Sequence, residues 1–286
     1  MAYAKINNVT NANMAKVNNV AKAAIGKISG IDAPSTGATF ADNKSLDFDG
    51  SDDYINIDDF EFTNENISVS WWCTRESTAH NKMILQALNN HDSDAYYKGF
   101  AMMAQQDVGL KWYFGEQAGG AYWGTNSGDI GFNSGDGWHH FVFTIGEGPT
   151  TAYISPPMAL YMDGNSVWTQ AGNPSGTSVV GSAVAIKLRI GVRQGGSNAW
   201  LGNINDVAFF DTVLTSAEVV AMYNSGDPTD LRVDGGDYAS SSNLTGYWWM
   251  GDEDTYPTIQ DRSTNSNDGT MTNMTSGDIE TDVPAP

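Results

Sequence analysis

The sequence predicts an all-β protein built as an antiparallel sandwich. From about Ala38 the chain consists of short segments in which apolar and polar residues alternate, which is typical of strands with one buried face. Gly, Asn, Asp and Ser separate these segments at short intervals. Only one helical pattern interrupts them, which argues against a parallel α/β fold.

About ten strands are expected between residues 45 and 211. Their β-branched and aromatic residues suit the pleated surface of a sheet, and their number suits two packed sheets. In chain order they are SLDFDG (45–50), DYINI (53–57), ISVSWWCTR (67–75), KMILQAL (82–88), GFAMMAQ (99–105), LKWYFGE (110–116), WHHFVFTIG (138–146), ALYMDGNSV (159–167), VAIKLRIGV (184–192) and GNINDVAFFD (202–211).

One helix is expected after the last of these strands, in TSAEVVAMYNSG (215–226). Thr215 is a good N-cap, and Glu218, three residues later, completes a capping box. Gly226 can end the helix because glycine adopts the left-handed conformation without strain.

The composition limits the possible functions. With 286 residues and 40% hydrophobic content, the chain can form one large β domain with appendages or two small domains. A net charge of −20 repels phosphate backbones, so we expect no nucleic-acid partner. We also expect no membrane partner, because no segment approaches the roughly 20 apolar residues that cross a bilayer. Cys73 is the only cysteine, which excludes an intrachain disulfide and favours a small buried apolar side chain.

Residues 1–37 differ from the rest of the chain in charge. Met1 to Ile31 contains four lysines and no carboxylate, although the whole chain has 34 acidic and 14 basic residues. The spacing of apolar residues predicts a short helix with a seam that anchors the protein: Met14, Val17, Ala21, Ala24 and Ile28. Because the seam is too short to form a coiled coil alone, it needs its own domain, another subunit or a particle to pack on. A disordered segment is the remaining alternative.

Five segments between about residues 40 and 226, taken in order, resemble the laminin-G-like, concanavalin A-like lectin/glucanase jelly roll. They are SLDFDGSDDYINI, ISVSWWC, GWHHFVFTI, LYMDGNSV and WLGNINDVAFFDTVLTSAEVVAMYNSG. The resemblance implies two packed antiparallel sheets over residues 38–226, with a short helix after the last strand.

The segment 244–275, which follows a linker at 227–243 and precedes an acidic tail at 276–286, looks like the beginning of that same domain. In the family a GYW strand and an Asp/Ser/Asn/Gly turn commonly precede the FDG strand, whereas here GYWWM and DRSTNSNDGT come last. We expect a circularly permuted first strand that completes the sandwich and buries Trp248 or Trp249, because neighbouring side chains on a strand point to opposite faces. Strand exchange with a neighbouring subunit and a truncated second domain are the alternatives.

Catalytic patterns are missing from the sequence. The glucanases of this superfamily carry carboxylates at alternate positions of one strand, as E-x-D-x-E, and the nearest approach here is the incomplete pair Asp59 and Glu61. The four histidines, His80, His91, His139 and His140, form no nucleophile or zinc motif. We therefore expect a protein that is not an enzyme.

A calcium site is the only cofactor that the sequence suggests. Hard oxygen ligands between loops commonly brace jelly rolls of this type, and the FDGSDDY turn and the NIND segment could supply them. The candidate ligands are Asp49, Asp52, Asp53, Asn205 and Asp206. The alternative is that these acidic turns only face solvent, and Asn205 stands where the family often has Asp.

Two loops combine aromatic rings with polar side chains, as a glycan site requires. The candidate residues are Tyr122, Trp123, Asn126 and Asp129 in the first loop, and Arg193, Gln194, Asn198 and Trp200 in the second. Each tryptophan could equally belong to the core.

A basic N-terminal segment followed by an acidic permuted jelly roll resembles virion proteins of marine tailed bacteriophages. This resemblance implies a structural protein on the outer surface of the virion, in a head or tail decoration or a fibre. The N-terminal segment would contact other virion proteins, the protein would form a homo-oligomer, and the jelly roll would contact host-surface glycans. A free or cell-surface lectin is the main alternative, and a glycosidase is a second.

Overall fold

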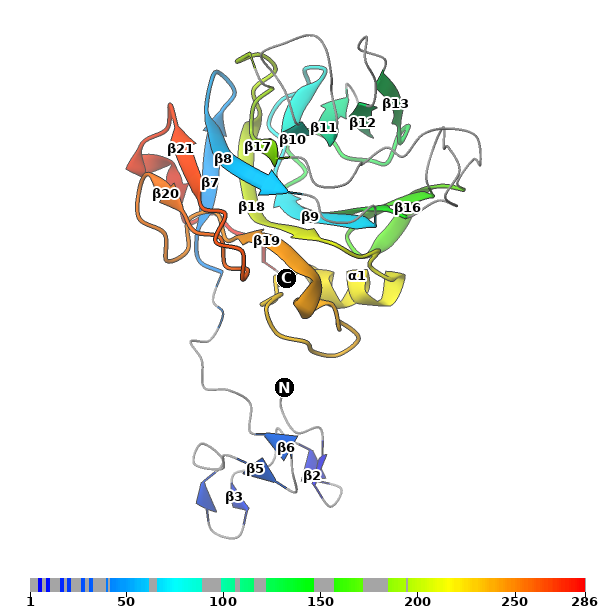
Figure 1. Ribbon diagram of the computed structural model, residues 1–286, viewed down its shortest axis with the longest axis vertical. Helices are drawn as coiled ribbons and strands as arrows, with labels where there is room; N and C mark the ends of the chain where they lie inside the picture. Colours follow the sequence, from blue (N-terminus) through cyan, green and yellow to red (C-terminus); the bar gives the residue numbers. More distant parts are fainter. Residues whose placement is uncertain are drawn as a thin grey trace. The chain divides into compact units, whose positions relative to one another are not determined.

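The computed structural model describes residue 40 and residues 42–61, 66–88, 99–105, 109–115, 122–146, 157–171, 185–193 and 195–285, together with the backbone of six two-residue strands between Lys5 and Asp32. The chain divides into two compact units, Met1–Ala41 and Asp42–Pro286, called here the N-terminal unit and the jelly roll. The predicted all-β sandwich with one short helix is confirmed in the jelly roll (Figure 1).

The described backbone of the N-terminal unit forms three antiparallel pairs of two-residue strands, called here hairpins. They are β1 (Lys5–Ile6) with β2 (Val9–Thr10), β3 (Lys16–Val17) with β4 (Val20–Ala21), and β5 (Lys27–Ile28) with β6 (Ile31–Asp32). In each hairpin the opening lysine pairs with the residue five positions later. The three lysines recur every 11 residues, so the unit is a three-copy repeat.

The predicted N-terminal helix is not seen where the backbone is described. Val17, Ala21 and Ile28 lie in β3, β4 and β5, whereas Met14 and Ala24 lie outside the described residues. A reason is visible in the sequence, where Asn18 and Asn19 separate the β-branched Val17 and Val20, a pattern that favours two short strands over a helix. The anchoring role of the segment stays a prediction.

The first sheet of the jelly roll, called here the β9 sheet, has the order β16-β15-β14-β9-β18-β7-β22, and β19 also pairs with β18. The long strand β18 pairs with β9 along one edge, while β7 and β19 share its other edge. The strands are β7 (Ser45–Asp49), β9 (Ile67–Cys73), β14 (His139–Ile145), β15 (Met158–Met162), β16 (Asn165–Gln170), β18 (Leu201–Phe210), β19 (Leu244–Trp248) and β22 (Ile279–Glu280).

The second sheet, called here the β10 sheet, has the order β13-β12-β11-β10-β17-β8-β21-β20. Its strands are β8 (Tyr54–Glu61), β10 (Lys82–Leu88), β11 (Gly99–Gln105), β12 (Gly109–Gly115), β13 (Tyr122–Asn126), β17 (Ala185–Ile190), β20 (Thr258–Ile259) and β21 (Gly269–Thr272). The named pairings in both sheets are antiparallel, as the alternating sequence pattern predicts.

The core fills the space between the two sheets with large aromatic side chains. Trp112 of the β10 sheet lies against Phe143 of the β9 sheet, with ring centroids 4.9 Å apart. The largest fully buried side chains are Trp71, Trp112, Trp200, Trp248, Tyr247, Phe48, Phe60, Phe100, Phe132, Phe141 and Phe143. Burial of each such ring contributes on the order of 2 kcal/mol or more to stability.

One predicted strand is divided. The segment 159–167 forms the hairpin of β15 and β16 instead of a single strand, because Asp163 and Gly164 have φ values of 50° and 76°. A turn that requires two residues in the left-handed region is typical of Asp-Gly. This turn brings Asp163 next to the histidines of β14, as described below.

The helix α1 (Ser216–Tyr223) begins as predicted, with a capping box between Thr215 and Glu218. It ends at Tyr223, and the C-cap Asn224 adopts the left-handed conformation with φ 44°. Tyr223 stacks on Trp72 of β9, with ring centroids 5.8 Å apart. The helix therefore covers the face of the β9 sheet that points away from the core (Figure 1).

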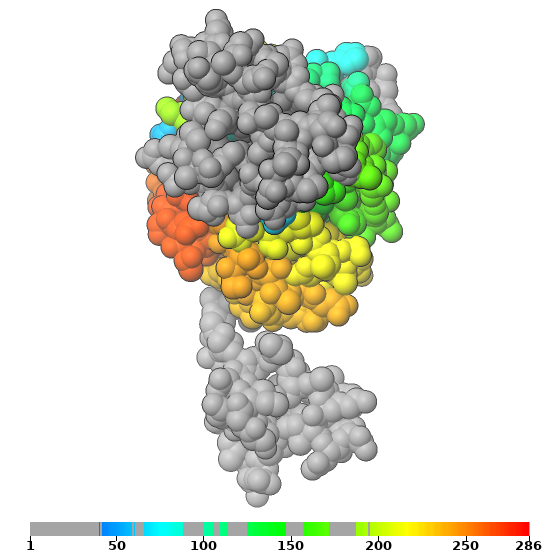
Figure 2. All heavy atoms as spheres, turned by 45° about the vertical axis from the view of Figure 1, so that its right-hand side comes forward, coloured from blue at the N-terminus to red at the C-terminus, as the bar shows by residue number. Residues whose placement is uncertain are grey.

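The C-terminal segment adds strands to both sheets of the same chain: β19 pairs with β18, β21 with β8, and β22 with β7. Trp248 is fully buried in the core. Trp249 points the other way and lies between Arg232 and Arg262, whose guanidinium carbons are 4.5 and 4.7 Å from its ring centroid. On the outside, the orange atoms of this region continue the surface of the yellow α1 region (Figure 2).

Candidate functional site

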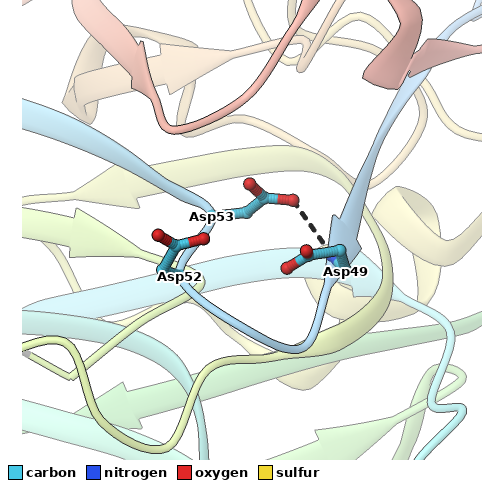
Figure 3. Close-up of side chains that lie close together, drawn as sticks. All are labelled: Asp49, Asp52 and Asp53. Carbon is cyan, nitrogen blue, oxygen red and sulfur yellow. Dashed lines mark hydrogen bonds between the residues drawn. The ribbon is translucent and has the colours of Figure 1, made fainter.

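Three predicted metal ligands meet in the turn between β7 and β8. Carboxylate oxygens of Asp49, Asp52 and Asp53 lie within 4.8 Å of one another (Figure 3). Asp53 Oδ2 accepts a hydrogen bond from the Asp49 backbone N–H (3.0 Å), and Asp49 Oδ1 accepts one from Ser51 (2.7 Å). Burial raises the pKa of Asp53 to about 6, and the charge of Asp49 acts in the same direction. Hard cations take such oxygens, so this turn stays a candidate calcium site.

The other two predicted ligands, Asn205 and Asp206, do not join this turn. Because β7 and β18 are antiparallel, Asp49 lies opposite Leu201, at the beginning of β18. Asn205 and Asp206 lie farther along β18, past the residue that pairs with Leu46, and both are buried. The structure therefore separates the five predicted ligands into two groups.

Asn205 and Asp206 belong to a second group of acidic side chains. Asn205 Nδ2 donates a hydrogen bond to Asp42 Oδ1 (2.7 Å), and Tyr247 Oη donates one to Asp206 Oδ1 (3.1 Å). Asp252 Oδ2 accepts hydrogen bonds from the backbone N–H groups of Asn43 (2.6 Å) and Lys44 (2.8 Å), which places this carboxylate beside Asp42. Asp42, Asn205, Asp206 and Asp252 are called here the β18 acidic cluster.

Burial dominates the electrostatics of this cluster. It raises the pKa of Asp42 to about 7, and the neighbouring charge of Asp252 raises it further, against a hydrogen bond from Asn205. Burial also raises the pKa of Asp206 well above its usual range, with the charge of Asp42 as the next cause. The cluster thus disfavours several negative charges at once.

The first predicted glycan loop is described in part. Tyr122 and Trp123 lie in β13, where their side chains are outside the described residues. Asn126 and Asp129 are exposed, and the Oδ1 atom of each accepts a backbone N–H from two residues on, at 3.0 and 2.9 Å. These bonds shape the turn, and both residues stay candidates for a glycan contact because they are exposed.

In the second predicted glycan loop the aromatic candidate is buried. Trp200 is fully buried in the core, so its ring cannot stack on a sugar and its expected role in a glycan site is wrong. Arg193 is exposed and Asn198 is half-buried, with φ 60°. Gln194 lies outside the described residues. The polar residues of this loop stay candidates.

The sequence-based prediction missed a polar and aromatic patch on the outer face of the β10 sheet. Thr270, Asn56 and Arg189 lie directly opposite one another on β21, β8 and β17. The Arg189 guanidinium lies over the ring of Tyr54, 4.6 Å from its centroid. The name Tyr54 patch is used for this group of residues: Tyr54, Asn56, Asp58, Lys187, Arg189 and Thr270.

Hydrogen bonds and ion pairs hold the polar heads of the Tyr54 patch. Asn56 Nδ2 donates to Asp58 Oδ2 (3.0 Å), and Asp58 Oδ1 lies 3.5 Å from Lys187 Nζ. The alternation in YINID could have revealed this face. Ile55 and Ile57 are fully buried, which leaves the residues between and beside them on the outer face.

Ser70 and His140 form a buried pair whose residue types could act as a nucleophile and a base. A substrate has no access to this pair. Ser70 Oγ lies 2.8 Å from His140 Nε2, and burial lowers the pKa of His140 to about 3, so that the ring is neutral at pH 7. The adjoining cavity measures about 10 Å³, the size of one water molecule. Asp163 binds His139 Nδ1 (2.7 Å) and the His140 backbone N–H (2.9 Å) instead of the His140 ring. The side chains of Asp59 and Glu61 lie outside the described residues.

The chain belongs to the concanavalin A-like lectin/glucanases superfamily, whose profile matches residues 49–220, more than half of its length. The resemblance inferred from five sequence segments is thereby confirmed. No curated protein matches the sequence. None of the described helices is long and apolar enough to span a membrane.

Solved structures share the fold at low sequence identity. A putative carbohydrate binding protein from Bacteroides ovatus is 15% identical with a TM-score of 0.54, over 90% of this chain and 68% of that chain. A heptameric SAP-like pentraxin from Limulus polyphemus is 16% identical with a TM-score of 0.48, over 72% and 92%. The CBM40 of the Ruminococcus gnavus IT-sialidase is 11% identical with a TM-score of 0.48, over 64% and 100%. At 15% identity the likeness to the Bacteroides ovatus protein shows the fold alone, and the ligand has to be argued from the residues of this chain.

Proposed function

We propose that this protein is a non-enzymatic carbohydrate-binding protein on the outer surface of a tailed-bacteriophage virion, where its jelly roll contacts host-surface glycans. Membership of a superfamily of lectins and glucanases supports the ligand class. The virion placement rests on the sequence alone, which joins a lysine-rich N-terminal unit to an acidic jelly roll. A free or cell-surface lectin is the alternative, and it shares the glycan recognition but not the attachment.

The Tyr54 patch is the observation that carries the ligand class. A sugar ring packs its C–H face on an aromatic ring, while its hydroxyl groups pair with amides, carboxylates and guanidinium groups. Tyr54, Asn56 and Arg189 offer these groups on two neighbouring strands, and each is partly exposed. A sheet holds them with less motion than a loop would, which reduces the entropy lost on binding.

Binding without catalysis agrees with the chemistry of the described residues. The E-x-D-x-E pattern of the glucanases is absent from the sequence. The Ser70–His140 pair adjoins a cavity of only about 10 Å³, which is too small to admit a sugar. The described groups therefore favour recognition of a glycan over its hydrolysis.

A glycan array with the full chain tests the ligand class, and calorimetry with the best ligand tests the site. We expect Tyr54→Ala and Asn56→Ala to weaken binding at least about tenfold, because each removes a contact worth about 1.4 kcal/mol or more. Tyr256→Ala is the matched control, since Tyr256 is 43% exposed and lies outside the patch. Unchanged affinity in both patch variants would move the site to the Tyr122–Asp129 loop, which Trp123→Ala tests. No binding to any glycan would exclude the carbohydrate function.

The virion placement is tested on purified particles. Mass spectrometry of density-purified virions should detect the protein in many copies per particle, and labelled antibody against the jelly roll should decorate intact particles. Light scattering of the purified protein gives the oligomeric state, for which we expect a homo-oligomer. Absence from particles would leave the free or cell-surface lectin as the better account.

A further inference from the structure

We propose that a groove beside α1 is a second carbohydrate site, which takes uncharged sugar units of a glycan. The inference rests on the proposed function for its ligand class, and it adds a site that shares no residue with the Tyr54 patch. The groove has a volume of about 450 Å³, within the roughly 300–1,000 Å³ of small-molecule sites. It is called here the α1 groove, and the lining residues that carry the argument are Asp163, Asn165, Val220, Tyr223, Asn224 and Ser225.

The α1 groove lies between two elements that come close together. One wall is the turn between β15 and β16, and the other is the last turn of α1 with its cap. The walls approach each other at Gly164, where an added Cβ would lie 3.2 Å from Tyr223 Cδ1 and 3.6 Å from Val220 Cα. Gly164, with φ 76°, therefore permits both the turn and the close approach.

Tyr223 and Val220 give the groove an apolar wall. The Tyr223 ring stacks on Trp72 of β9 and on His140 of β14, with ring centroids 5.8 and 6.2 Å apart. Because Trp72 and His140 are cross-strand partners, two neighbouring strands of the sheet hold the ring in place. Tyr223 is half-buried and Val220 is 56% exposed. A fixed aromatic ring beside an aliphatic side chain suits the C–H face of a sugar.

Asp163 is a fixed hydrogen-bond acceptor in the same groove. Its Oδ2 lies 2.7 Å from His139 Nδ1, and its Oδ1 accepts the His140 backbone N–H at 2.9 Å. Each oxygen of a carboxylate can accept more than one hydrogen bond. Asp163 can therefore receive a hydroxyl group of a ligand without leaving its present partners, which keeps the cost of binding low.

Two amide side chains of the groove are held by one end and open at the other. Asn165 Nδ2 donates to the Asp163 carbonyl (3.0 Å), and Asn224 Nδ2 donates to the Asp227 carbonyl (3.0 Å). The Oδ1 atom of neither amide forms a hydrogen bond with another described residue. Both residues are exposed, so these two oxygens can accept hydrogen bonds from a ligand.

The polar groups of the groove indicate which ligand it takes. The hydroxyl groups of Tyr223 and Ser225 also have no hydrogen-bond partner in the described part of the chain, and a hydroxyl both donates and accepts. A sugar hydroxyl does the same, so it can pair with these groups and with the amide oxygens. Among the described lining residues there is no lysine or arginine, whereas Asp163 is a carboxylate. A ligand with a carboxylate or phosphate would be repelled, which favours neutral sugars.

The α1 groove and the Tyr54 patch lie on opposite outer faces of the sandwich. The helix α1 covers the outer face of the β9 sheet, and the Tyr54 patch belongs to the outer face of the β10 sheet (Figure 1). One chain would therefore hold two separate glycan strands at once. In a dense glycan layer such a pair of sites raises the overall affinity without any new contact at either site.

The competing account is a hollow that results only from the packing of α1 against the turn of β15 and β16. In that account the polar groups of the groove contact water alone and respond to no sugar. The two accounts differ in one measurable property, the response of the groove residues to a neutral oligosaccharide.

The test is NMR of the isotope-labelled full chain, titrated in turn with neutral tetrasaccharides of glucose, galactose, mannose and N-acetylglucosamine. With at least one of them we expect saturable shifts of the backbone amides of Gly164, Asn165 and Asn224. Asn165→Ala and Asn224→Gly should each weaken this binding about fivefold to tenfold, because each removes one hydrogen bond. Glycine keeps the left-handed conformation of the cap. Ser216→Ala is the matched control and should keep the affinity of the parent, since Ser216 is exposed on α1 outside the groove.

Each outcome decides the inference. Saturable shifts in the groove that both Asn variants weaken and the Ser216 variant retains support it. Shifts confined to the Tyr54 patch or to the Tyr122–Asp129 loop overturn it and leave the proposed function intact, and so does binding of acidic glycans alone. Shifts in the groove with unchanged affinity in both Asn variants overturn it as well. Lack of binding to every glycan of an array excludes the proposed carbohydrate function and the second site with it.

Discussion

The indole of Trp248 packs against the ring of Phe60, with ring centroids 5.9 Å apart and planes inclined at 59°. Phe60 lies on β8 of the β10 sheet and Trp248 ends β19 of the β9 sheet, so this contact joins the two sheets. Trp248 Nε1 also donates a hydrogen bond to the Asn267 carbonyl (2.9 Å). The C-terminal segment thus fills part of the core in addition to supplying strands.

Truncation after Ser242 should therefore destabilise the jelly roll severely. It removes β19, β20, β21 and β22, and it exposes the edges of β18 and β8. Loss of the buried Trp248 alone costs on the order of 3–5 kcal/mol. The whole free energy of unfolding of a domain is roughly 5–15 kcal/mol. We expect aggregation in size-exclusion chromatography or a much lower Tm. A control chain that ends after Asp282 keeps all four strands and should melt like the full chain. Equal melting of the Ser242 truncation would show that the segment is only an appendage.

The two neighbouring tryptophans should differ in their response to substitution. Trp248→Ala opens a cavity between the sheets and should cost on the order of 3–5 kcal/mol. Trp249→Ala removes a ring held between Arg232 and Arg262, and we expect roughly 1–3 kcal/mol. Chemical denaturation measures both free energies of unfolding, with Trp248→Phe as a milder variant. A larger loss for Trp249→Ala than for Trp248→Ala would contradict this division of roles.

Periodicity and local motifs were enough to predict most of the fold. Alternating segments such as ISVSWWC give β9 directly, and the Thr215–Glu218 capping box gives the start of α1. The sequence pattern does not reveal the Asp163–Gly164 turn, because LYMDGNSV is also compatible with one continuous strand. In the N-terminal unit the heptad-like spacing of apolar residues predicts a helix, whereas the described strands follow the 11-residue recurrence of lysine.

The candidate sites were harder to predict because they depend on strand register. The sequence motifs group Asn205 and Asp206 with Asp49 as candidate ligands, but the antiparallel pairing of β7 with β18 separates them from Asp49. Asp42 and Asp252 stand far apart in sequence and meet only when the C-terminal segment folds back. The burial of Trp200 also depends on how segments distant in sequence pack together. No local pattern in the sequence therefore distinguishes a buried Trp200 from an exposed one.

Gly191 should be intolerant of any side chain. It has φ 96°, and a Cβ there would lie 2.3 Å from Phe48 Cε1 in the core. Gly195 is a matched control, because it has φ 89° but a Cβ there would meet no described atom within 4 Å. We expect Gly195→Ala to cost about 1–2 kcal/mol from backbone strain alone, and Gly191→Ala to cost clearly more. Equal losses of stability would mean that Phe48 moves aside without cost.

The stability of the metal-free protein should depend on the protonation of Asp42. Its pKa is raised from 3.8 to about 7 in the folded state, so the folded protein binds a proton more tightly than the unfolded chain. The resulting stabilisation is fully present below pH 3.8 and is lost as the pH rises through about 7. In chelator, the free energy of unfolding of the parent relative to Asp42→Asn should fall between about pH 4 and pH 8, by about 4 kcal/mol at most. A difference independent of pH would show that Asp42 is ionised throughout this range.

Deletion of Met1–Ile31 should separate attachment from folding. The jelly roll forms its own compact unit from Asp42 onward, so the shortened protein should keep its Tm within about 1 °C. It should no longer join the virion if the three lysine-led hairpins attach it. Replacing Lys5, Lys16 and Lys27 by Gln keeps the apolar residues and the hairpin loops, and it tests whether charge contributes to the attachment. An electrostatic contribution also requires that added salt weakens attachment of the parent more than that of the triple variant. Normal incorporation of the deletion variant into particles would show that the anchor lies in the jelly roll instead.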